Sequence, residues 1–120
     1  MAKRDRRGAE KRGRTAETFA VWWLRLKGYS VLERRFKRPV GEVDIIAKRG
    51  QILAFIEVKQ RRSIPLGQTA VTAQAWQRIA RAAELWAATH PISQTLDWRF
   101  DLIAISTTSA PKHFRDYWRP

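Results

Sequence analysis

The chain has 120 residues, 44% of them hydrophobic, with no cysteine and a formal net charge of +13 at pH 7. This length and composition predict one globular domain with a single core, and they exclude a disordered chain, disulfide bonds and thiolate zinc sites. The large excess of cations favours a phosphate-rich partner such as nucleic acid, while no apolar run approaches the ~20 residues that a membrane span requires.

The N-terminal segment is strongly basic, since residues 1–14 hold seven Lys or Arg against two acids. We expect residues 1–12 to form a flexible arm, followed by one folded domain over residues 13–120. The apolar stretch at residues 19–24 is too short for a signal peptide and is followed at once by Arg25. Together with the absence of cysteine, this predicts a cytoplasmic protein.

A helix is predicted from about residue 10 or 13 to residue 27, where Gly28 offers a natural C-terminal end. Glu17 lies at the edge of its apolar stripe, in a first turn where the helix dipole favours an acid. The stripe itself recurs at helical spacing and is expected to face the core: Ala16, Phe19, Ala20, Trp23 and Leu26.

A strand is predicted over residues 29–36, where polar and apolar side chains alternate. A basic run overlaps its end and continues to Pro39: Arg34, Arg35, Lys37 and Arg38. Such runs are commonly solvated turns. This run leads directly into an acidic hairpin, so we interpret Arg34 and Arg35 as contacts for nucleic-acid phosphates.

A β-hairpin is predicted over residues 41–59, where two apolar runs flank a polar turn that contains Gly50. Four ionisable residues interrupt these runs: Glu42, Asp44, Glu57 and Lys59. Side chains alternate along a strand, so the two acids of the first strand share a face, as do the two charged residues of the second. The second strand is otherwise apolar on both faces, which is typical of a central strand between helices.

The hairpin has two alternative registers. If the turn is residues 49–50, Glu42 falls opposite Glu57 and Asp44 is diagonal to it. If the turn is residues 50–51, Asp44 faces Glu57 directly. Both registers bring the four charged groups onto one face, with cross-strand Cβ separations of roughly 5 to 8 Å.

Asp44 and Glu57 are candidate ligands for a divalent cation, Mg²⁺ or Mn²⁺. Carboxylates that face each other across strands repel, and partly buried carboxylates are costly unless they are paired or bind a metal. Hard cations prefer such oxygen ligands. Lys59 is expected to neutralise a phosphate or orient a water. The alternative interpretation is a solvated strand face with a simple Glu57–Lys59 pair.

The segment after the hairpin is predicted to be a loop and a second helix. The loop, residues 60–68, places Arg61 and Arg62 at the mouth of the proposed site as further phosphate contacts. The helix is expected over residues 69–89, ended by His90 and Pro91. Its buried side is predicted to consist of Val71, Ala75, Ile79, Ala82, Ala83 and Trp86.

The last part of the chain is predicted to form a strand over residues 96–106 and a short edge strand over residues 112–118. Asp101 interrupts the first of these strands, and we interpret it as a structural acid that pairs with Arg99 or with a basic group near the site. A right-handed helical crossover would make this strand parallel to the second strand of the hairpin. Three tryptophans are candidates for exposed positions where bases could stack: Trp22, Trp76 or Trp118.

The charged hairpin resembles the site of a known nuclease superfamily. Residues 41–44 and 55–59 look like the core motif of the PD-(D/E)XK nucleases. Within that superfamily the chain is similar to the YraN-like family of small bacterial predicted endonucleases, which is itself similar to Holliday-junction resolvases. The resemblance spans about residues 13–105 and also includes residues 13–17, Gly28, Tyr29 and residues 99–101.

This resemblance implies a single nuclease-like domain with a restriction-endonuclease-like α/β fold: a mixed β-sheet flanked by helices, in the order α-β-β-β-α-β. It implies a Mg²⁺-dependent endonuclease that hydrolyses phosphodiester bonds in branched or flapped DNA. Asp44 and Glu57 would bind the metal with the Val58 carbonyl as a third ligand. Lys59 would position the attacking water. Glu17 would assist the metal through water, and Glu42 would support the ligands.

Other functions are also compatible with the sequence. The family's usual helical Lys falls near Ala75, where Gln74 or Gln77 is the nearest substitute, so a non-catalytic nucleic-acid-binding protein is the alternative. A membrane-surface or ribosome-associated basic protein is a weaker one. We expect DNA rather than a membrane as the partner, and a homodimer is compatible with the sequence.

Overall fold

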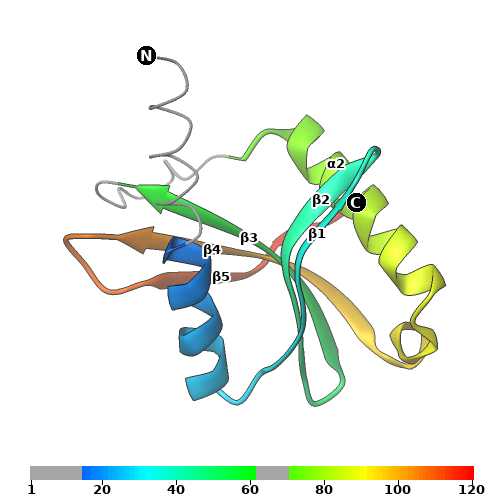
Figure 1. Ribbon diagram of the computed structural model, residues 1–120, viewed down its shortest axis with the longest axis horizontal. Helices are drawn as coiled ribbons and strands as arrows, with labels where there is room; N and C mark the ends of the chain where they lie inside the picture. The colour runs from blue at the N-terminus through cyan, green and yellow to red at the C-terminus, as the bar shows by residue number, and fades with distance from the viewer. Residues whose placement is uncertain (1–14, 62–70) are drawn as a thin grey trace.

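The computed structural model describes residues 15–61 and 71–120. The chain forms a five-stranded sheet and an N-terminal helix at residues 15–26. Figure 1 shows that the sheet is twisted and that this helix and helix α2 pack against it. The sheet order is β1-β2-β3-β4-β5, and only the β3–β4 pair is parallel. The remaining elements follow in chain order: β1 (Ser30–Arg38), β2 (Gly41–Arg49), β3 (Ile52–Arg61), α2 (Ala73–Ala88), the short 3-10 helix η1 (Pro91–Thr95), β4 (Asp97–Ser106) and β5 (Lys112–Trp118).

This architecture confirms the predicted mixed α/β fold and is consistent with the restriction-endonuclease-like class. The parallel β3–β4 pair follows from the α2 crossover, as the sequence indicated. The edge strand expected near the C-terminus forms as β5. No helix within the described part of the chain is long and apolar enough to cross a bilayer. The predicted basic arm, residues 1–12, lies outside the described residues.

Local chemistry fixes where the helices end and begin. Gly28 adopts a φ of +88°, and the Tyr29 N–H donates to the Leu24 carbonyl at 3.0 Å, which closes the N-terminal helix as predicted. Helix α2 begins later than predicted. The Thr72 hydroxyl accepts a hydrogen bond from the Ala75 N–H at 3.1 Å, so this residue caps the helix and α2 does not start at residue 69.

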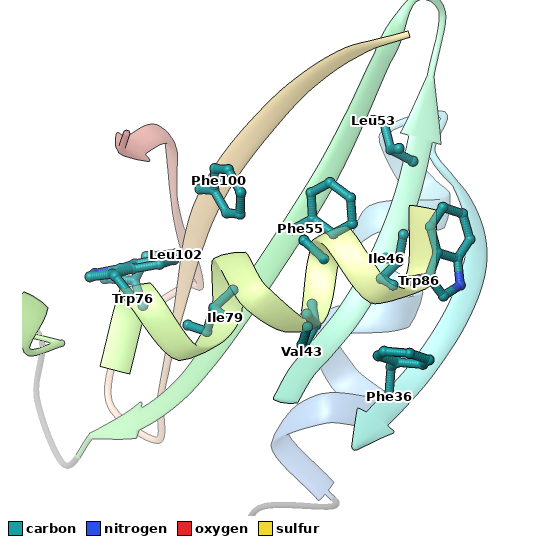
Figure 2. Packing of buried hydrophobic residues seen from close by; sticks show 12 residues of the cluster. Phe36, Val43, Ile46, Leu53, Phe55, Trp76, Ile79, Trp86, Phe100 and Leu102 are labelled. Carbon is teal, nitrogen blue, oxygen red and sulfur yellow. The ribbon is translucent and has the colours of Figure 1, made fainter. Parts of the chain in front are cut away.

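Two hydrophobic clusters cover the two faces of the sheet. Figure 2 shows the cluster between the sheet and α2, in which Phe55 and Trp86 meet edge to face with ring centroids 6.3 Å apart. The other cluster lies between the sheet and the N-terminal helix. Strand β3 contributes to both, through Leu53 and Phe55 on one face and Ala54 and Ile56 on the other. The central position predicted for this strand is therefore confirmed.

The buried face of the N-terminal helix differs from the predicted stripe. Phe19 and Leu26 are exposed, although the sequence pattern placed them in the core. Small side chains allow a helix backbone to approach a sheet closely, and the two alanines of the predicted stripe do so here. The face that the helix buries against the sheet consists of Ala16, Ala20, Val21 and Leu24.

The buried face of α2 also required correction. Trp76, a candidate for an exposed position, is buried and stacks on Trp118 with ring centroids 5.7 Å apart. Val71 and Ala75, predicted as buried, are only half-buried. The partner of Trp76 is on β5, whose packing role could not be inferred from its short sequence.

Gly41 lies where α2 crosses the start of β2. A Cβ atom at this position would come within 1.9 Å of the Arg78 carbonyl oxygen, far inside van der Waals contact. Only glycine therefore lets the α2 backbone rest directly on the strand that carries Asp44. This contact holds the helix against the hairpin next to the candidate site.

Candidate active site

The β2–β3 register brings Asp44 opposite Glu57. Arg49 pairs with Ile52 and Ile45 pairs with Ile56, so the turn is residues 50–51. This is the second of the two registers that the sequence allowed. When this pairing is continued by one residue, Asp44 and Glu57 lie directly across from each other on neighbouring strands. The expectation that these two carboxyl groups lie close together is confirmed.

Asp44 lies at a break in the alternation of β2. Val43 packs in the α2 cluster, whereas Ile45 packs in the cluster under the N-terminal helix. The Asp44 carboxylate accepts a hydrogen bond from the backbone N–H of Val58 at 2.8 Å. A side chain that bonds to the backbone of the next strand lies along the sheet, so the simple face alternation expected for β2 does not hold at this position.

Glu57 and Lys59 complete the site from β3. The Lys59 Nζ lies 3.4 Å from a Glu57 carboxylate oxygen, and their side chains are 34% and 13% exposed. Glu57 also shares a hydrogen bond with Asp44. Two carboxyl groups can share a hydrogen bond only if one of them holds the proton. The pair thus behaves as one titrating unit in the absence of a cation.

Glu17 reaches the same site from the N-terminal helix. It is buried, and its carboxylate accepts a 2.5 Å hydrogen bond from the Nε of Arg35. Arg34 and Phe36 pair with Ile45 and Val43, respectively, so Arg35 lies across from Asp44. Its backbone adopts a φ of +53°, which is rare for a residue other than glycine and is held by the surrounding structure.

Burial raises the pKa values of all three acids. Removal from water is the largest cause in each case. Burial and the charge of Glu57 together raise the pKa of Asp44 to about 8. The pKa of Glu57 is also raised, against the opposing effect of Lys59. The pKa of Glu17 is raised by burial and by Asp44, although the bond from Arg35 opposes this. The site therefore favours a bound cation or proton.

The other predicted site residues lie around this acidic centre. Glu42 is exposed, with a carboxylate oxygen 3.9 Å from the Lys37 Nζ, and its charge acts on Asp44 and Glu57. Arg34 is exposed and donates to the Thr18 hydroxyl at 3.1 Å. Arg61 donates to its neighbour's carbonyl. Arg62 lies outside the described residues, and Arg35 donates a hydrogen bond from its Nε to Glu17.

The donor set fits a hard divalent cation that keeps part of its water shell. Within residues 15–61 and 71–120, no group of three or more His, Cys, Asp or Glu side chains is placed to hold a metal. Magnesium is commonly bound through one or two carboxylates, with waters and substrate phosphates as the other ligands. Asp44 and Glu57 supply two carboxylates of this kind, and the Val58 carbonyl belongs to the strand segment that bonds to Asp44.

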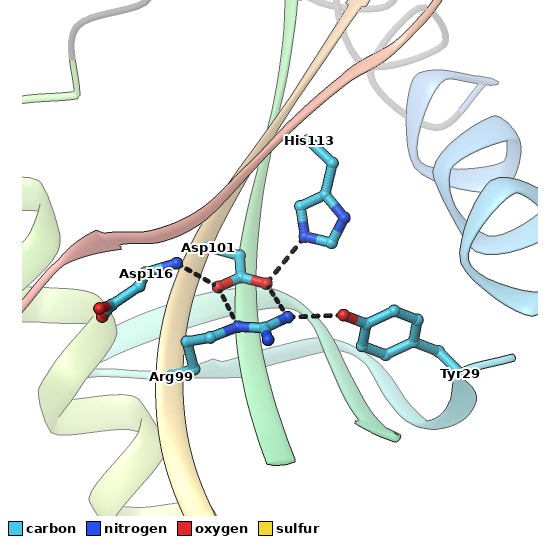
Figure 3. A network of polar contacts seen from close by, with 5 residues as sticks. All are labelled: Tyr29, Arg99, Asp101, His113 and Asp116. Atoms are coloured by element: carbon cyan, nitrogen blue, oxygen red, sulfur yellow. Dashed lines mark hydrogen bonds and ion pairs between the residues drawn. The ribbon is translucent and has the colours of Figure 1, made fainter. Parts of the chain in front are cut away.

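A second polar network lies on β4 and β5 (Figure 3). Asp101 is 0% exposed and accepts hydrogen bonds from Arg99, at 2.7 and 2.8 Å, and from His113 Nε2 at 2.8 Å. The backbone N–H of Asp116 donates a further bond at 2.9 Å. Arg99 also bonds to the Tyr29 hydroxyl at 2.6 Å. The carboxylate is saturated, so the structural role predicted for Asp101 is confirmed.

Two of these contacts could not be found from the sequence. The Glu17–Arg35 bond joins residues on a helix and a strand, and no spacing rule links such positions. The Asp101–His113 bond depends on the β4–β5 pairing, and no sequence spacing links these two residues. The only signal in the sequence was the place of Asp101 within an apolar strand.

The fold and the site define a class: small mixed α/β domains that hold a carboxylate pair on two neighbouring central strands. Residues 16–105 match the uncharacterised protein family UPF0102, and the chain belongs to this family. The match includes every candidate site residue from Glu17 to Arg62.

Individual relatives cover nearly the whole chain. A UPF0102 protein of Nitrobacter winogradskyi is 46% identical over 101 residues, which is 84% of this chain and 86% of the relative. One from Bartonella bacilliformis is 41% identical over 118 residues, covering 98% and 97%. One from Rhodopseudomonas palustris is 45% identical over 109 residues, covering 91% and 84%.

Proposed function

We propose that the protein is a metal-dependent endonuclease that hydrolyses phosphodiester bonds in structured DNA, such as a branch or a flap. The observation that carries this proposal is the register that sets Asp44 opposite Glu57, with the Lys59 ammonium 3.4 Å from Glu57. The net charge of +13 supports a polyanionic substrate. The resemblance of this hairpin to the PD-(D/E)XK motif supports the same reaction class.

In the proposed mechanism each residue has a separate task. Asp44 and Glu57 would hold Mg²⁺ or Mn²⁺, with the Val58 carbonyl as a third oxygen. When bound, the ion supplies charge relief on the phosphate and lowers the pKa of a water. The ammonium of Lys59 positions the attacking water and stabilises negative charge in the transition state. Glu17, held by Arg35, would assist the metal through its bound waters. Glu42 stays at the exposed edge.

A non-catalytic nucleic-acid-binding protein is the second candidate. It is favoured by the Arg35–Glu17 bond, because a built-in cation already neutralises part of the acidic site without a metal. Ala75 at the position of the family's usual helical Lys points the same way. Nucleic-acid binding would then depend on the basic surface alone.

The decisive experiment compares the parent with Glu57→Gln on linear, flapped and four-way DNAs in Mg²⁺, Mn²⁺ or EDTA. Glu84→Gln is the matched control, because it removes one carboxylate from the exposed face of α2. We expect cleavage by the parent and by Glu84→Gln in metal, and none by Glu57→Gln. Binding by all three proteins without any metal-dependent cleavage would instead support the non-catalytic alternative.

A further inference from the structure

The N-terminal helix presents an apolar stripe to solvent. Phe19, Trp22 and Leu26 are 52%, 60% and 84% exposed. Their spacing places them on one face, one helical turn apart. This face points away from the sheet, because the opposite face is the one buried in the core. Large apolar side chains gathered on an exposed face commonly mark a binding surface.

Cations flank this stripe on both sides. The Arg25 guanidinium lies 5.5 Å from the centre of the Trp22 ring, and the Lys27 Nζ lies 4.4 Å from the centre of the Trp23 ring. Arg34 reaches the helix through its bond to Thr18. Flat aromatic surfaces interleaved with Arg and Lys suit a ligand that carries both planar rings and negative charges.

A second copy of this chain does not fit this surface well. Each copy carries a net charge of +13, and the cations border the stripe itself, so pairing two stripes would bring like charges together. A nucleic-acid strand satisfies both features, because its bases stack on aromatic rings and its phosphates pair with Arg and Lys.

The stripe lies on the outer face of the helix that carries Glu17, opposite its buried face. Trp22 is five residues from Glu17, roughly 8 Å along the helix axis and about 140° around it. In duplex DNA the bases are stacked inside and their faces are unavailable. Only unpaired bases could meet these side chains.

We infer that Phe19 and Trp22 form a stacking platform for unpaired bases of a nucleic-acid strand, with Arg25 and Lys27 at its phosphates. This inference rests on the proposed function and narrows the substrate to DNA with a single-stranded segment that reaches the outer face of the N-terminal helix. Leu26 extends the apolar surface at the far end of the platform.

The test measures binding of labelled single-stranded oligonucleotides by fluorescence anisotropy in EDTA. An oligonucleotide with normal bases is compared with one of equal length whose central nucleotides are abasic, so that the phosphate charge is constant. The proteins are the parent, Phe19→Ala/Trp22→Ala and the control Leu85→Ala/Ile92→Ala, which removes exposed apolar side chains elsewhere. Thermal melts check that all three are folded.

We expect the parent and the control to bind the normal strand about tenfold or more tightly than the abasic strand. Phe19→Ala/Trp22→Ala should bind both strands equally, with its abasic affinity unchanged. The inference would be overturned if the parent and this variant preferred the normal strand over the abasic strand to the same extent. Binding to vesicles of phosphatidylcholine and phosphatidylserine is measured as well. A variant that keeps its base preference but loses vesicle binding would show that the stripe is a membrane contact, which would also overturn the inference.

The outcome is independent of the proposed hydrolysis, because EDTA removes the metal. A protein without nuclease activity can still show the base preference. Conversely, cleavage that depends on Glu57 can occur in a protein whose base preference does not depend on Trp22.

Discussion

The Asp44 carboxylate accepts a hydrogen bond from the backbone N–H of Val58 across the β2–β3 pair, at 2.8 Å. This bond fixes the position of one candidate ligand through the backbone of the neighbouring strand. An amide oxygen can accept the same bond, so the geometry does not require the negative charge. The charge and the shape of the site can therefore be separated by mutation.

We predict that Asp44→Asn and Glu57→Gln are as stable as the parent, or slightly more stable, in EDTA. Each removes repulsion between buried acids while it keeps nearly the same shape. Each should also lose the stabilisation that Mg²⁺ gives the parent, since a ligand stabilises only through its affinity for the folded state. Binding of DNA should survive, because the basic surface is unchanged.

Thermal melts with and without Mg²⁺ decide this prediction. If Glu57 mainly neutralised Lys59 in the core, metal-free Glu57→Gln would lose about 3–5 kcal/mol of stability, because a buried charge would be left unpaired. Such a loss would show that this pair is a structural element. The partial exposure of Lys59 argues for the smaller effect.

We predict that the metal-free protein becomes less stable as pH rises from about 4 to about 8. The pKa of Asp44 is raised from its ordinary value of 3.8 to about 8 by burial and by Glu57. Within this window the folded state holds a proton that the unfolded state has released, so the free energy of unfolding falls with pH, by at most about 1.4 kcal/mol per pH unit. Raised pKa values of Glu17 and Glu57 act in the same direction.

The measurement is a series of thermal melts in EDTA across this range, with Asp44→Asn as the comparison. The variant should show a flatter profile, since it lacks the group whose pKa shift is largest. A parent whose stability is constant or rises through this window would contradict the assignment of a raised pKa to Asp44.

Asp101→Ala is predicted to lose about 3–5 kcal/mol of stability, because Arg99 and His113 would be left buried without their partner. The matched control is Asp116→Asn, which changes an exposed carboxylate paired with Arg119 and should have little effect on stability, because water screens this pair. Chemical denaturation of both variants gives the comparison. Similar small losses for the two would mean that the network does not hold β4 to β5.

The same network predicts acid sensitivity. Burial alone would raise the pKa of Asp101, but the hydrogen bonds from His113 and Arg99 outweigh it and hold the pKa below its ordinary value of 3.8. The stabilisation is thus present above that value and is lost as pH falls through the lower pKa of the folded state. Asp101→Ala should remove this part of the acid transition.

Gly41→Ala is predicted to destabilise the protein more than Gly50→Ala. The first adds a methyl group against the backbone of Arg78, which can be relieved only by moving α2 away from β2. The second introduces a side chain at a φ of +58° in open space, at a cost of about 1–2 kcal/mol. Equal unfolding free energies for the two variants would contradict the close approach of α2.

Binding to DNA is predicted to weaken about a thousandfold between about 50 and 200 mM salt, because several phosphate contacts release counterions. Arg34→Gln and Arg61→Gln should each lower the salt slope by about 1. Arg119→Gln, which changes an arginine already paired with Asp116, is the control. A salt-independent affinity would exclude these arginines as phosphate contacts.

Much of this fold could be predicted because its strands carry strong local patterns. The apolar run of β3 indicated a central strand, and Gly50 indicated the hairpin turn but left two registers open, of which the structure has the one that sets Asp44 opposite Glu57. The outward face of the N-terminal helix could not be predicted, since Phe19 and Leu26 also recur at helical spacing. Only the packing of the helix against the sheet decides which face is buried.

The candidate site was likewise predictable where it depends on local sequence, and unpredictable where it depends on contacts between distant elements. The acids of the hairpin lie close together because of the short turn, which is a local property of the sequence. The partner of Glu17 depends on the positive φ of Arg35 within β1. No propensity rule predicts a left-handed arginine inside a strand, because only the assembled structure stabilises that conformation.

The place of β3 in the chain has a consequence for protein synthesis. This strand is complete at Arg61, but its parallel neighbour β4 begins only at Asp97. A ribosome therefore releases an apolar strand whose free edge has no partner until α2 and η1 have also emerged. Such an edge is a template for aggregation between nascent chains. We expect Glu57 and Lys59, charged residues near the end of this strand, to act as gatekeepers that keep two unfinished chains apart.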